Sequence, residues 1–126
     1  MKAVFDTNIL IDHLCGLAEA AAAWAAYPDK IISRITFMEV LAGADTPQEE
    51  QTARGLLASF RIIELDVGLS ESVVTLRKAH HKKIKLPDAI IYATAKSEAC
   101  PLITRNTKDF GTAAGDVIEP YVIPPP

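Results

Sequence analysis

The sequence has little of what would place it in several large classes of protein. Only two cysteines, Cys15 and Cys100, occur in 126 residues, and the start lacks the regions of a secretion signal, which disfavours a disulfide-stabilised secreted fold. No apolar run reaches the ~20 residues that cross a bilayer, and the densest, residues 17–26, is mostly alanine. We therefore expect a cytoplasmic protein with no membrane segment.

A surplus of positive charge is also missing. The chain has 13 Lys and Arg residues against 16 Asp and Glu residues, which gives a formal net charge of −3. This is a poor profile for a protein that holds nucleic acid through bulk positive charge, so any contact with a polyanion must be local. What the chain does have is apolar content of 49%, which excludes intrinsic disorder and is enough for the core of one domain over residues 1–126.

Short apolar runs alternate with stretches of helical periodicity along the chain. The runs predict strands at residues 1–5, 31–32, 61–65, 102–104 and 117–118. The periodic stretches predict helices at residues 9–14, 17–24, 35–42, 47–59, 67–79 and 87–95, with a polar loop at 105–110. Strands separated by helices imply right-handed crossovers and a sheet covered on both faces. We predict an α/β fold, a three-layer α/β/α sandwich around a mainly parallel sheet of four to five strands.

Two of the predicted helices begin with recognisable capping residues. Thr46 and Glu49 have the spacing of a capping box, in which Thr46 caps the helix, Pro47 takes its first position and Glu49 reaches back to the cap. Asp66 precedes the helix at 67–79 and is a suitable N-cap. These signals place the helix starts more firmly than periodicity alone.

Two acidic residues fall where a parallel α/β sheet binds ligands, near the carboxyl ends of its strands, and two more stand in apolar surroundings. Asp6 ends the first strand, Asp109 lies after the fourth, Asp88 opens a buried helix, and Glu39 stands among apolar neighbours. Several buried carboxylates together need a cation, because each is costly to desolvate alone. Oxygen-rich sites of this kind suit Mg²⁺ or Mn²⁺ and not Zn²⁺.

Each acid also has a simpler structural explanation. Asp6 could cap a helix, and Asp88 could owe its place to the helix dipole, which favours an anion at the N-terminus. Glu39 could face solvent, and Asp109 could cap a turn before Phe110. The set is more specific than any of its members.

Four blocks of sequence carry a resemblance to a known family. They are residues 4–12 (VFDTNILID), 33–43 (SRITFMEVLAG), 86–95 (LPDAIIYATA) and 102–110 (LITRNTKDF). In this order they resemble the four signature blocks of PIN-domain proteins, and they extend over most of the chain. Within that family, the short length and the Glu-Val-Leu-Ala-Gly string most resemble VapC-type toxins of bacterial toxin–antitoxin pairs, including the related FitB type.

The resemblance implies an endoribonuclease that depends on Mg²⁺ or Mn²⁺. The family's catalytic and metal-binding acids carry over to Asp6, Glu39 and Asp88, with a fourth position in the last block. That position falls on Asp109 first, with the neutral amide of Asn106 as the alternative. The implied reaction is attack of a metal-activated water on phosphorus, which leaves 5′-phosphate and 3′-hydroxyl ends.

Other polar residues of the blocks are candidates for supporting roles. Thr7, Asn8, Thr104 and Asn106 could orient the carboxylates or the water. The candidates for contact with RNA phosphates are Arg34, Lys82, Lys83, Lys85, Arg105 and Lys108. The alternative for the lysines is a solvated helix end. Without the four acids of the site, the 13 basic residues outnumber the remaining acidic residues by one, so the surplus acidity belongs to the site itself.

The resemblance also implies partners. A cognate antitoxin would lay its C-terminal segment in an apolar groove between the early helices, and a homodimer would join it in a larger toxin–antitoxin complex. Trp24, Tyr27 and Phe37 are the candidate contacts.

Other functions share some of these features. A haloacid-dehalogenase-like phosphatase also has an Asp at the end of its first strand, but it needs a second Asp where this chain has Asn8. A nuclease-inactive PIN-fold module that binds RNA or a protein would have lost an acid, whereas three acids are intact here. Activity is therefore favoured.

Overall fold

The protein, described by a computed structural model over residues 1–80, 83–110 and 116–123, alternates strands with helices. The first half contains β1 (Lys2–Phe5), α1 (Thr7–Leu14), α2 (Ala18–Ala25), β2 (Asp29–Ser33), α3 (Arg34–Ala42) and α4 (Pro47–Leu57). The second half contains β3 (Arg61–Ile63), α5 (Val67–Ala79), α6 (Leu86–Ser97), β4 (Leu102–Ile103), α7 (Thr107–Phe110) and β5 (Val117–Ile118). The strands form one sheet in the order β3-β2-β1-β4-β5, and every neighbouring pair is parallel.

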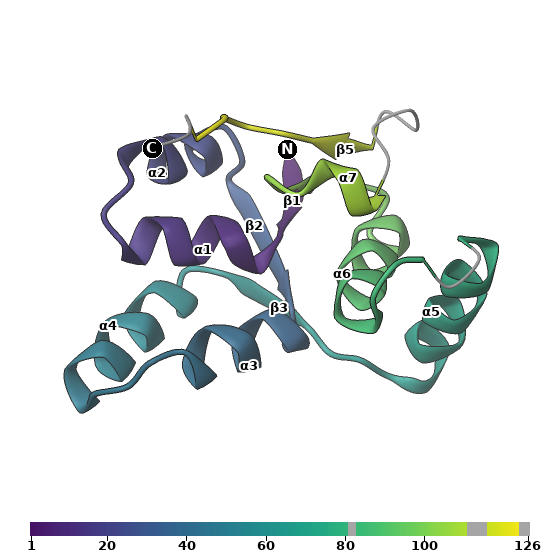
Figure 1. Ribbon diagram of the computed structural model, residues 1–126, viewed down its shortest axis with the longest axis horizontal. Coiled ribbons are helices and arrows are strands. Elements are labelled where there is room, and N and C mark those ends of the chain that lie inside the picture. Colours follow the sequence, from purple (N-terminus) through teal and green to yellow (C-terminus); the bar gives the residue numbers. More distant parts are fainter. Residues whose placement is uncertain (81–82, 111–115, 124–126) are drawn as a thin grey trace.

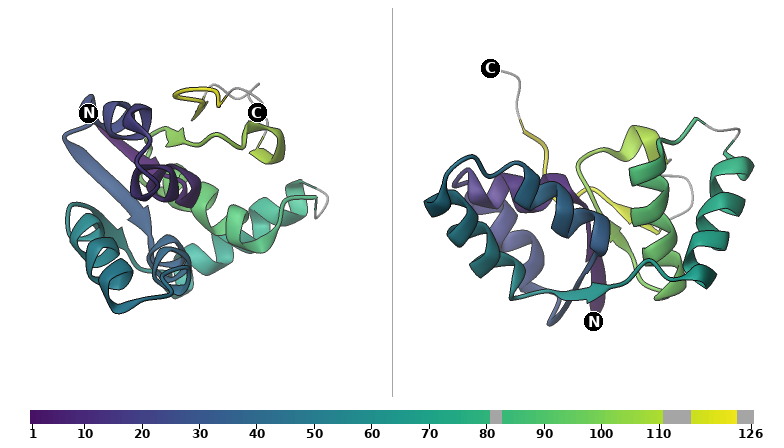
Figure 2. Two further views of the ribbon diagram at one scale, coloured as in Figure 1. Left: turned by 60° about the vertical axis from the view of Figure 1, so that its left-hand side comes forward. Right: turned by 90° about the horizontal axis from the view of Figure 1, so that it is seen from below.

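The sheet is covered on both faces, as predicted. Helices α1 to α4 lie on one side, and α5, α6 and α7 lie on the other (Figure 1; the right-hand view of Figure 2 shows the same division). Successive residues of a strand point to opposite faces. Val4 and Ile31 therefore enter the core under α5 and α6, while Phe5 and Ile32 enter the core under α1 to α4. This alternation confirms the three-layer α/β/α sandwich.

Aromatic side chains cluster around Phe5 in the core that lies under α1 to α4. Phe5 is fully buried, and the rings of Trp24, Tyr27 and Phe60 contact it edge to face with centroids 5.8–5.9 Å away. Such pairs add to the free energy gained by burying apolar surface. The cluster joins β1 to α2 and fixes the strand that ends at Asp6.

The predicted helix caps are present. Thr46 Oγ1 accepts a hydrogen bond from Glu49 N at 3.1 Å, and Asp66 Oδ1 accepts one from Leu69 N at 2.8 Å. Gly43 is the C-cap of α3.

Two local predictions were wrong. Residues 105–110 are not a loop throughout, because α7 forms one turn there and buries Phe110 against Tyr92 at 5.6 Å between centroids. A helix of four residues is too short to produce a periodic pattern. In addition, β3 ends at Ile63 instead of residue 65, since its partner β2 ends at Ser33, the last residue in register. Within the described ranges, no helix is both long and apolar enough to span a membrane.

We expect Phe5→Ala to lower the free energy of unfolding by about 3–5 kcal/mol, because it empties the centre of a tightly packed aromatic cluster. Urea unfolding followed by circular dichroism measures this change. The control is Val74→Ala on α5, a half-exposed position where the change is expected within about 0.5 kcal/mol. Equal losses in both variants would contradict the central place of Phe5.

Candidate functional site

The site lies at the carboxyl edge of the sheet, where β1 and β4 end side by side. Asp6 N donates a hydrogen bond to Ile103 O at 2.9 Å, and Thr104 N donates one to Ile118 O at 3.0 Å. This pairing brings the two side chains together, and Thr104 Oγ1 donates to Asp6 Oδ2 at 2.7 Å. Residues 98 positions apart in the chain thus meet at the end of neighbouring strands.

The Asp6 carboxylate is almost fully buried and has two functions in the structure. It caps α1, since its Oδ1 accepts a hydrogen bond from Thr7 N at 2.7 Å, and only 4% of the residue is exposed. Burial, helped by the nearby charge of Asp88, raises its pKa from the ordinary 3.8 to about 6, against the hydrogen bond from Thr104 that favours the charged form. Asp6 therefore caps α1, and it also lies among the other acids of the predicted site.

Glu39 reaches the same place from α3. Thr7 Oγ1 donates to Glu39 Oε1 at 2.7 Å and lies 3.0 Å from Oγ1 of the fully buried Thr36. The charge of Glu39 also contributes to the raised pKa of Asp6. Glu39 is exposed, as its simpler explanation required, but Thr7 ties its carboxylate to the start of α1.

Asn8 and Thr104 connect the start of α1 to the segment that follows β4. Asn8 Nδ2 donates to Thr104 Oγ1 at 3.2 Å and to Asp6 Oδ2 at 3.4 Å, while its Oδ1 accepts from Arg105 N at 3.4 Å. Thr104 Oγ1 also accepts from Asn106 N at 2.9 Å. The side chains predicted to orient the carboxylates thus form one hydrogen-bonded group around Asp6.

An open cavity of about 340 Å³ collects most of the predicted site. Its lining consists of Asp6, Thr7, Asn8, Ile11, Glu39, Asp88, Arg105 and Asn106. Asp88 enters from the first turn of α6 and is half-buried. Asp109 falls on α7, but its side chain lies outside what the structure describes. The structure thus brings together three predicted acids from three helices or helix starts, with Asn106 beside them.

The donor set has the chemistry of a site for a hard cation. Within residues 1–80, 83–110 and 116–123, leaving aside the Asp109 side chain, no three His, Cys, Asp or Glu residues converge closely enough to form a complete metal cage. Mg²⁺ does not need one, because it keeps several waters and binds proteins through one or two carboxylates. Asp6 and Asp88 are two oxygen donors whose charges oppose each other in the cavity. These residues fit such an ion.

Comparison with known proteins finds a family match that includes all four sequence blocks. A family model for the PIN domain matches residues 3–115. The chain belongs to the PIN domain family. It is 49% identical to a chain in a solved structure of a toxin–antitoxin complex from Klebsiella pneumoniae, with 96% of this chain and 99% of that chain covered and a TM-score of 0.87.

Two further relatives agree with this assignment. A ribonuclease VapC from Rickettsia bellii (strain RML369-C) is 28% identical over 120 residues, which cover 87% of this chain and 89% of the relative. FitAcB from Neisseria gonorrhoeae, solved as a crystal structure, is 24% identical over 94% of this chain and 97% of that one, with a TM-score of 0.72. The second likeness shows the fold alone, and it is the PIN fold that the four sequence blocks predicted.

The arginines expected to contact RNA in this PIN domain already have acidic partners. Arg34 donates to Glu64 through both Nε, at 2.9 Å, and Nη2, and its guanidinium lies 4.7 Å from the ring centroid of Phe37. Arg105 donates to Asp12 in the same two-pronged way. The sequence analysis missed both acids, because each lies at least 30 residues from its arginine and no local spacing signals the pair.

The structure describes three of the four lysines that were predicted to contact RNA. Lys83 and Lys85 are exposed in the segment before α6, and Lys108 is exposed on α7. Lys82 lies outside the described residues. Lys85 directly precedes the helix that carries Asp88, and Lys108 follows the cavity residue Asn106 in the chain, so both lie close in sequence to the cavity.

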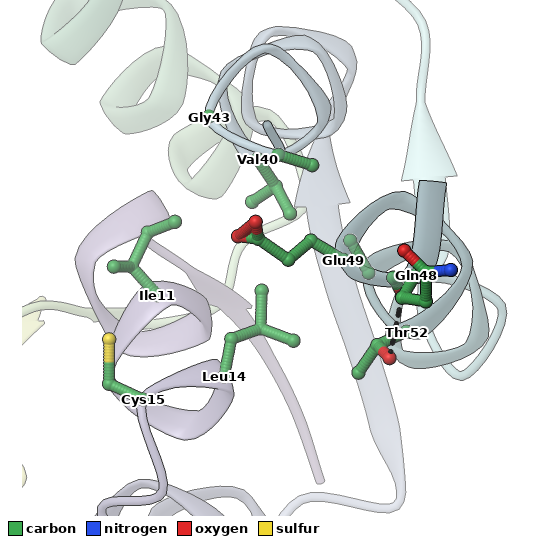
Figure 3. A pocket seen from close by; sticks show the side chains of 10 residues that line it. Ile11, Leu14, Cys15, Val40, Gly43, Gln48, Glu49 and Thr52 are labelled. Atoms are coloured by element: carbon green, nitrogen blue, oxygen red, sulfur yellow. Dashed lines mark hydrogen bonds between the residues drawn. The ribbon is translucent and has the colours of Figure 1, made fainter. Parts of the chain in front are cut away.

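An apolar groove of about 410 Å³ adjoins the acidic cavity. It lies between α1, α3 and α4 and is lined by Ile11, Leu14, Cys15, Val40, Gly43, Ala44, Gln48, Glu49, Thr52 and Ala53 (Figure 3). Ile11 lines both the groove and the cavity, so the two are neighbours on the surface. The Glu49 carboxylate extends from α4 into the groove toward Ile11 and Val40 (Figure 3), so it does not complete the predicted capping box.

The aromatic residues predicted as antitoxin contacts are not in this groove. Trp24 and Tyr27 pack against Phe5, and Phe37 lies beneath Arg34. The groove that the structure shows is lined by small and aliphatic side chains with one acid. The expected kind of surface is present, but different residues form it.

Asp6→Asn should stabilise the protein at pH 7 in a buffer with EDTA. A raised pKa means that the folded chain binds the proton of Asp6 more tightly than the unfolded chain, so this carboxyl group costs stability as pH rises from about 4 to about 6. Asparagine removes that cost, and we expect a gain of about 2–3 kcal/mol at pH 7 that vanishes near pH 4. Urea unfolding across this range measures it.

The control is Asp45→Asn, which changes an exposed aspartate. Its difference from the wild type should stay small at every pH. A difference between Asp6→Asn and the wild type that does not grow between pH 4 and 7 would contradict the crowding of charge around Asp6.

Proposed function

We propose that this PIN domain is the ribonuclease toxin of a toxin–antitoxin pair and that it hydrolyses RNA with a divalent cation. The observation that carries the proposal is the convergence of Asp6, Glu39 and Asp88 on one open cavity at the carboxyl edge of the sheet. The similarity to a protein named ribonuclease VapC supports the reaction, and the 49% identity to a chain of a toxin–antitoxin complex supports the biological setting.

Asp6 and Asp88 are the residues that would hold Mg²⁺ or Mn²⁺, with Glu39 and either Asn106 or Asp109 near the same ion. A bound ion would polarise a phosphate oxygen and lower the pKa of a water molecule. Thr104 and the backbone N–H of Thr7 keep both Asp6 oxygens in place from the protein side. The carboxylate is therefore oriented before substrate arrives.

Glu39 has a different environment from Asp6, and we assign it a different task. It is exposed and is oriented by the Thr7 hydroxyl at 2.7 Å, so it can accept the proton of a water molecule that attacks phosphorus. The bond from phosphorus to the 3′ oxygen then breaks, that oxygen takes a proton from solvent as it leaves, and Glu39 returns its proton to solvent. The products carry a 5′-phosphate and a 3′-hydroxyl. No side chain of the protein acts as a nucleophile.

Asp6→Asn and Asp88→Asn should each lower RNA cleavage by at least about 100-fold, because each removes a charge that the cation needs. The purified protein is incubated with RNA in Mg²⁺, in Mn²⁺ and in EDTA, and the new 5′ ends are sequenced. Asp45→Asn serves as the control, with cleavage at the wild-type rate.

Cleavage by folded Asp6→Asn at the wild-type rate would sink the assignment of the site. An inactive wild type that still binds RNA or a protein would instead support the alternative, a nuclease-inactive binding module. The three acids in the cavity favour the active enzyme over that module.

The groove in Figure 3 is the surface that we propose for the antitoxin. It is apolar, and it neighbours the acidic cavity at Ile11, so one extended segment could fill the groove and close the cavity. The Glu49 carboxylate would be covered by such a segment. Because a covered charge is costly without a partner, the segment should carry a Lys or Arg that meets it.

A homodimer that joins the antitoxin in a larger complex completes the proposal. Met38 on α3, Leu65 in the segment between β3 and α5, and Val67 at the start of α5 present exposed apolar side chains that a second copy could cover. Sedimentation of the purified chain measures the oligomeric state.

Glu49→Lys should weaken binding of the cognate antitoxin by about tenfold or more, because it replaces an attractive charge in the groove by a repulsive one. Calorimetry with the cognate antitoxin measures the affinity. Glu50→Lys is the matched control. Glu50 follows Glu49 in the chain, but it does not line the groove and instead pairs with Arg54 on the outside of α4. Equal effects of the two substitutions would contradict the groove as the docking surface.

A further inference from the structure

Arg105, at the rim of the acidic cavity, is held by two residues that the proposed chemistry does not use. Its Nε lies 2.5 Å from Asp12 Oδ2, and its Nη2 lies 3.1 Å from Asp12 Oδ1. Tyr121 donates its hydroxyl to the same Asp12 Oδ2 at 2.6 Å. The Asp12 side chain is 11% exposed, so this is a shielded ion pair and not a loose contact on the surface.

The three residues come from three distant parts of the chain. Asp12 is on α1, Arg105 follows β4, and Tyr121 lies in the segment that leaves β5 and passes toward α1 and α2 (Figure 1). Burial and the Asp12 carboxylate raise the pKa of the Tyr121 hydroxyl, so it stays a donor at any physiological pH. The C-terminal segment thus contributes a side chain to the neighbourhood of the site.

The pairing of Arg105 with Asp12 solves a problem of charge. Arg105 lines the same cavity as Asp6, Glu39 and Asp88, and an unrestrained guanidinium there would pair with one of these acids and compete with a cation. Asp12 engages it from the side of α1 instead. The Arg105 guanidinium is thereby engaged by an acid that lies outside the proposed catalytic set.

The geometry also leaves the guanidinium able to bind a ligand. Asp12 takes Nε and one N–H of Nη2, whereas an arginine side chain has further N–H donors in the same plane. About a third of the Arg105 side chain is exposed. Planar donors held rigidly at the edge of a cavity match the geometry of a phosphate group.

On the basis of the proposed function, we propose that Asp12 and Tyr121 are positioning residues that fix Arg105 at the rim of the acidic cavity, where its guanidinium binds a phosphate of the RNA backbone. Arg105 then contacts the substrate, whereas Asp12 and Tyr121 act only through Arg105. Loss of either should weaken RNA binding without removing any of the acids that carry the reaction.

The experiment measures the affinity of a fluorescent single-stranded RNA by anisotropy, in EDTA so that cleavage does not occur, at several salt concentrations. Arg105→Gln should weaken binding about tenfold and reduce the slope of log K against log salt by about 0.7, the value for one phosphate contact to a single strand. Asp12→Asn should weaken RNA binding when it is made in the wild-type protein. It should have no further effect when it is added to the Arg105→Gln variant. With metal, the same variants should raise KM more than they lower kcat.

The matched control is Arg61→Gln. Arg61 makes the same two-pronged pair with Asp29, at the opposite edge of the sheet where β2 and β3 begin. This substitution should leave both the affinity and the salt slope unchanged. Equal losses in Arg61→Gln and Arg105→Gln would show a general loss of charge and overturn the proposal.

Asp12→Asn leaves a half-buried guanidinium poorly paired, so it could fail to fold. Tyr121→Phe then tests the same link, because it removes one hydroxyl and keeps the ion pair, and we expect a loss of about twofold to threefold in affinity that disappears in the Arg105→Gln background. An unchanged affinity in Arg105→Gln overturns the proposal. So does an effect of Tyr121→Phe or Asp12→Asn that is the same in both backgrounds.

These results separate the inference from the proposed function. A wild type that cleaves and binds RNA, with variants that bind equally well, overturns the positioning role alone. A wild type that neither binds nor cleaves RNA overturns both.

Discussion

The rest of the site depends on the burial of one carboxylate, that of Asp6, close to two others. Desolvation and the charges of Asp88 and Glu39 oppose its ionisation, and hydrogen bonds from Thr104 and from the backbone of Thr7 favour it. This balance requires β1 to end next to β4 and requires α1 to begin at Asp6. It gathers three carboxylates around one cavity, which is an arrangement of oxygen donors that suits a divalent cation.

The fold and the acids could be predicted because their signals are local. Strand ends, caps such as Thr46 and Asp66, and the order of the four sequence blocks are each visible within about ten residues. The turn of α7 and the early end of β3 were missed, because they depend on Phe110 meeting Tyr92 and on the length of β2. The predicted acids Asp6, Glu39 and Asp88 do meet in one cavity.

The partners of the basic residues could not be predicted, and this changes how the net charge is interpreted. Asp12 lies 93 residues from Arg105, and Glu64 lies 30 residues from Arg34, so neither pair has a pattern that a sequence can reveal. The acids outside the cavity are therefore not simply solvating groups. Two of them hold arginines in place, and a net charge of −3 is compatible with a few well-placed cationic donors at the site.

The groove and the cavity share Ile11, so the surface that would receive a partner and the surface that would receive RNA are neighbours. A segment that covers the first can close the second without any change in the fold. Helix α1 is the central element, because Asp6 caps it and it carries both Ile11 and Asp12.

The central claim is that these crowded carboxylates form a site for a divalent cation. Calorimetric titration of Mn²⁺ into the metal-free protein at pH 7 tests this claim most directly. The account predicts saturable binding to the wild type that is lost in Asp6→Asn, whereas equal binding by the two proteins, or none by either, would contradict it.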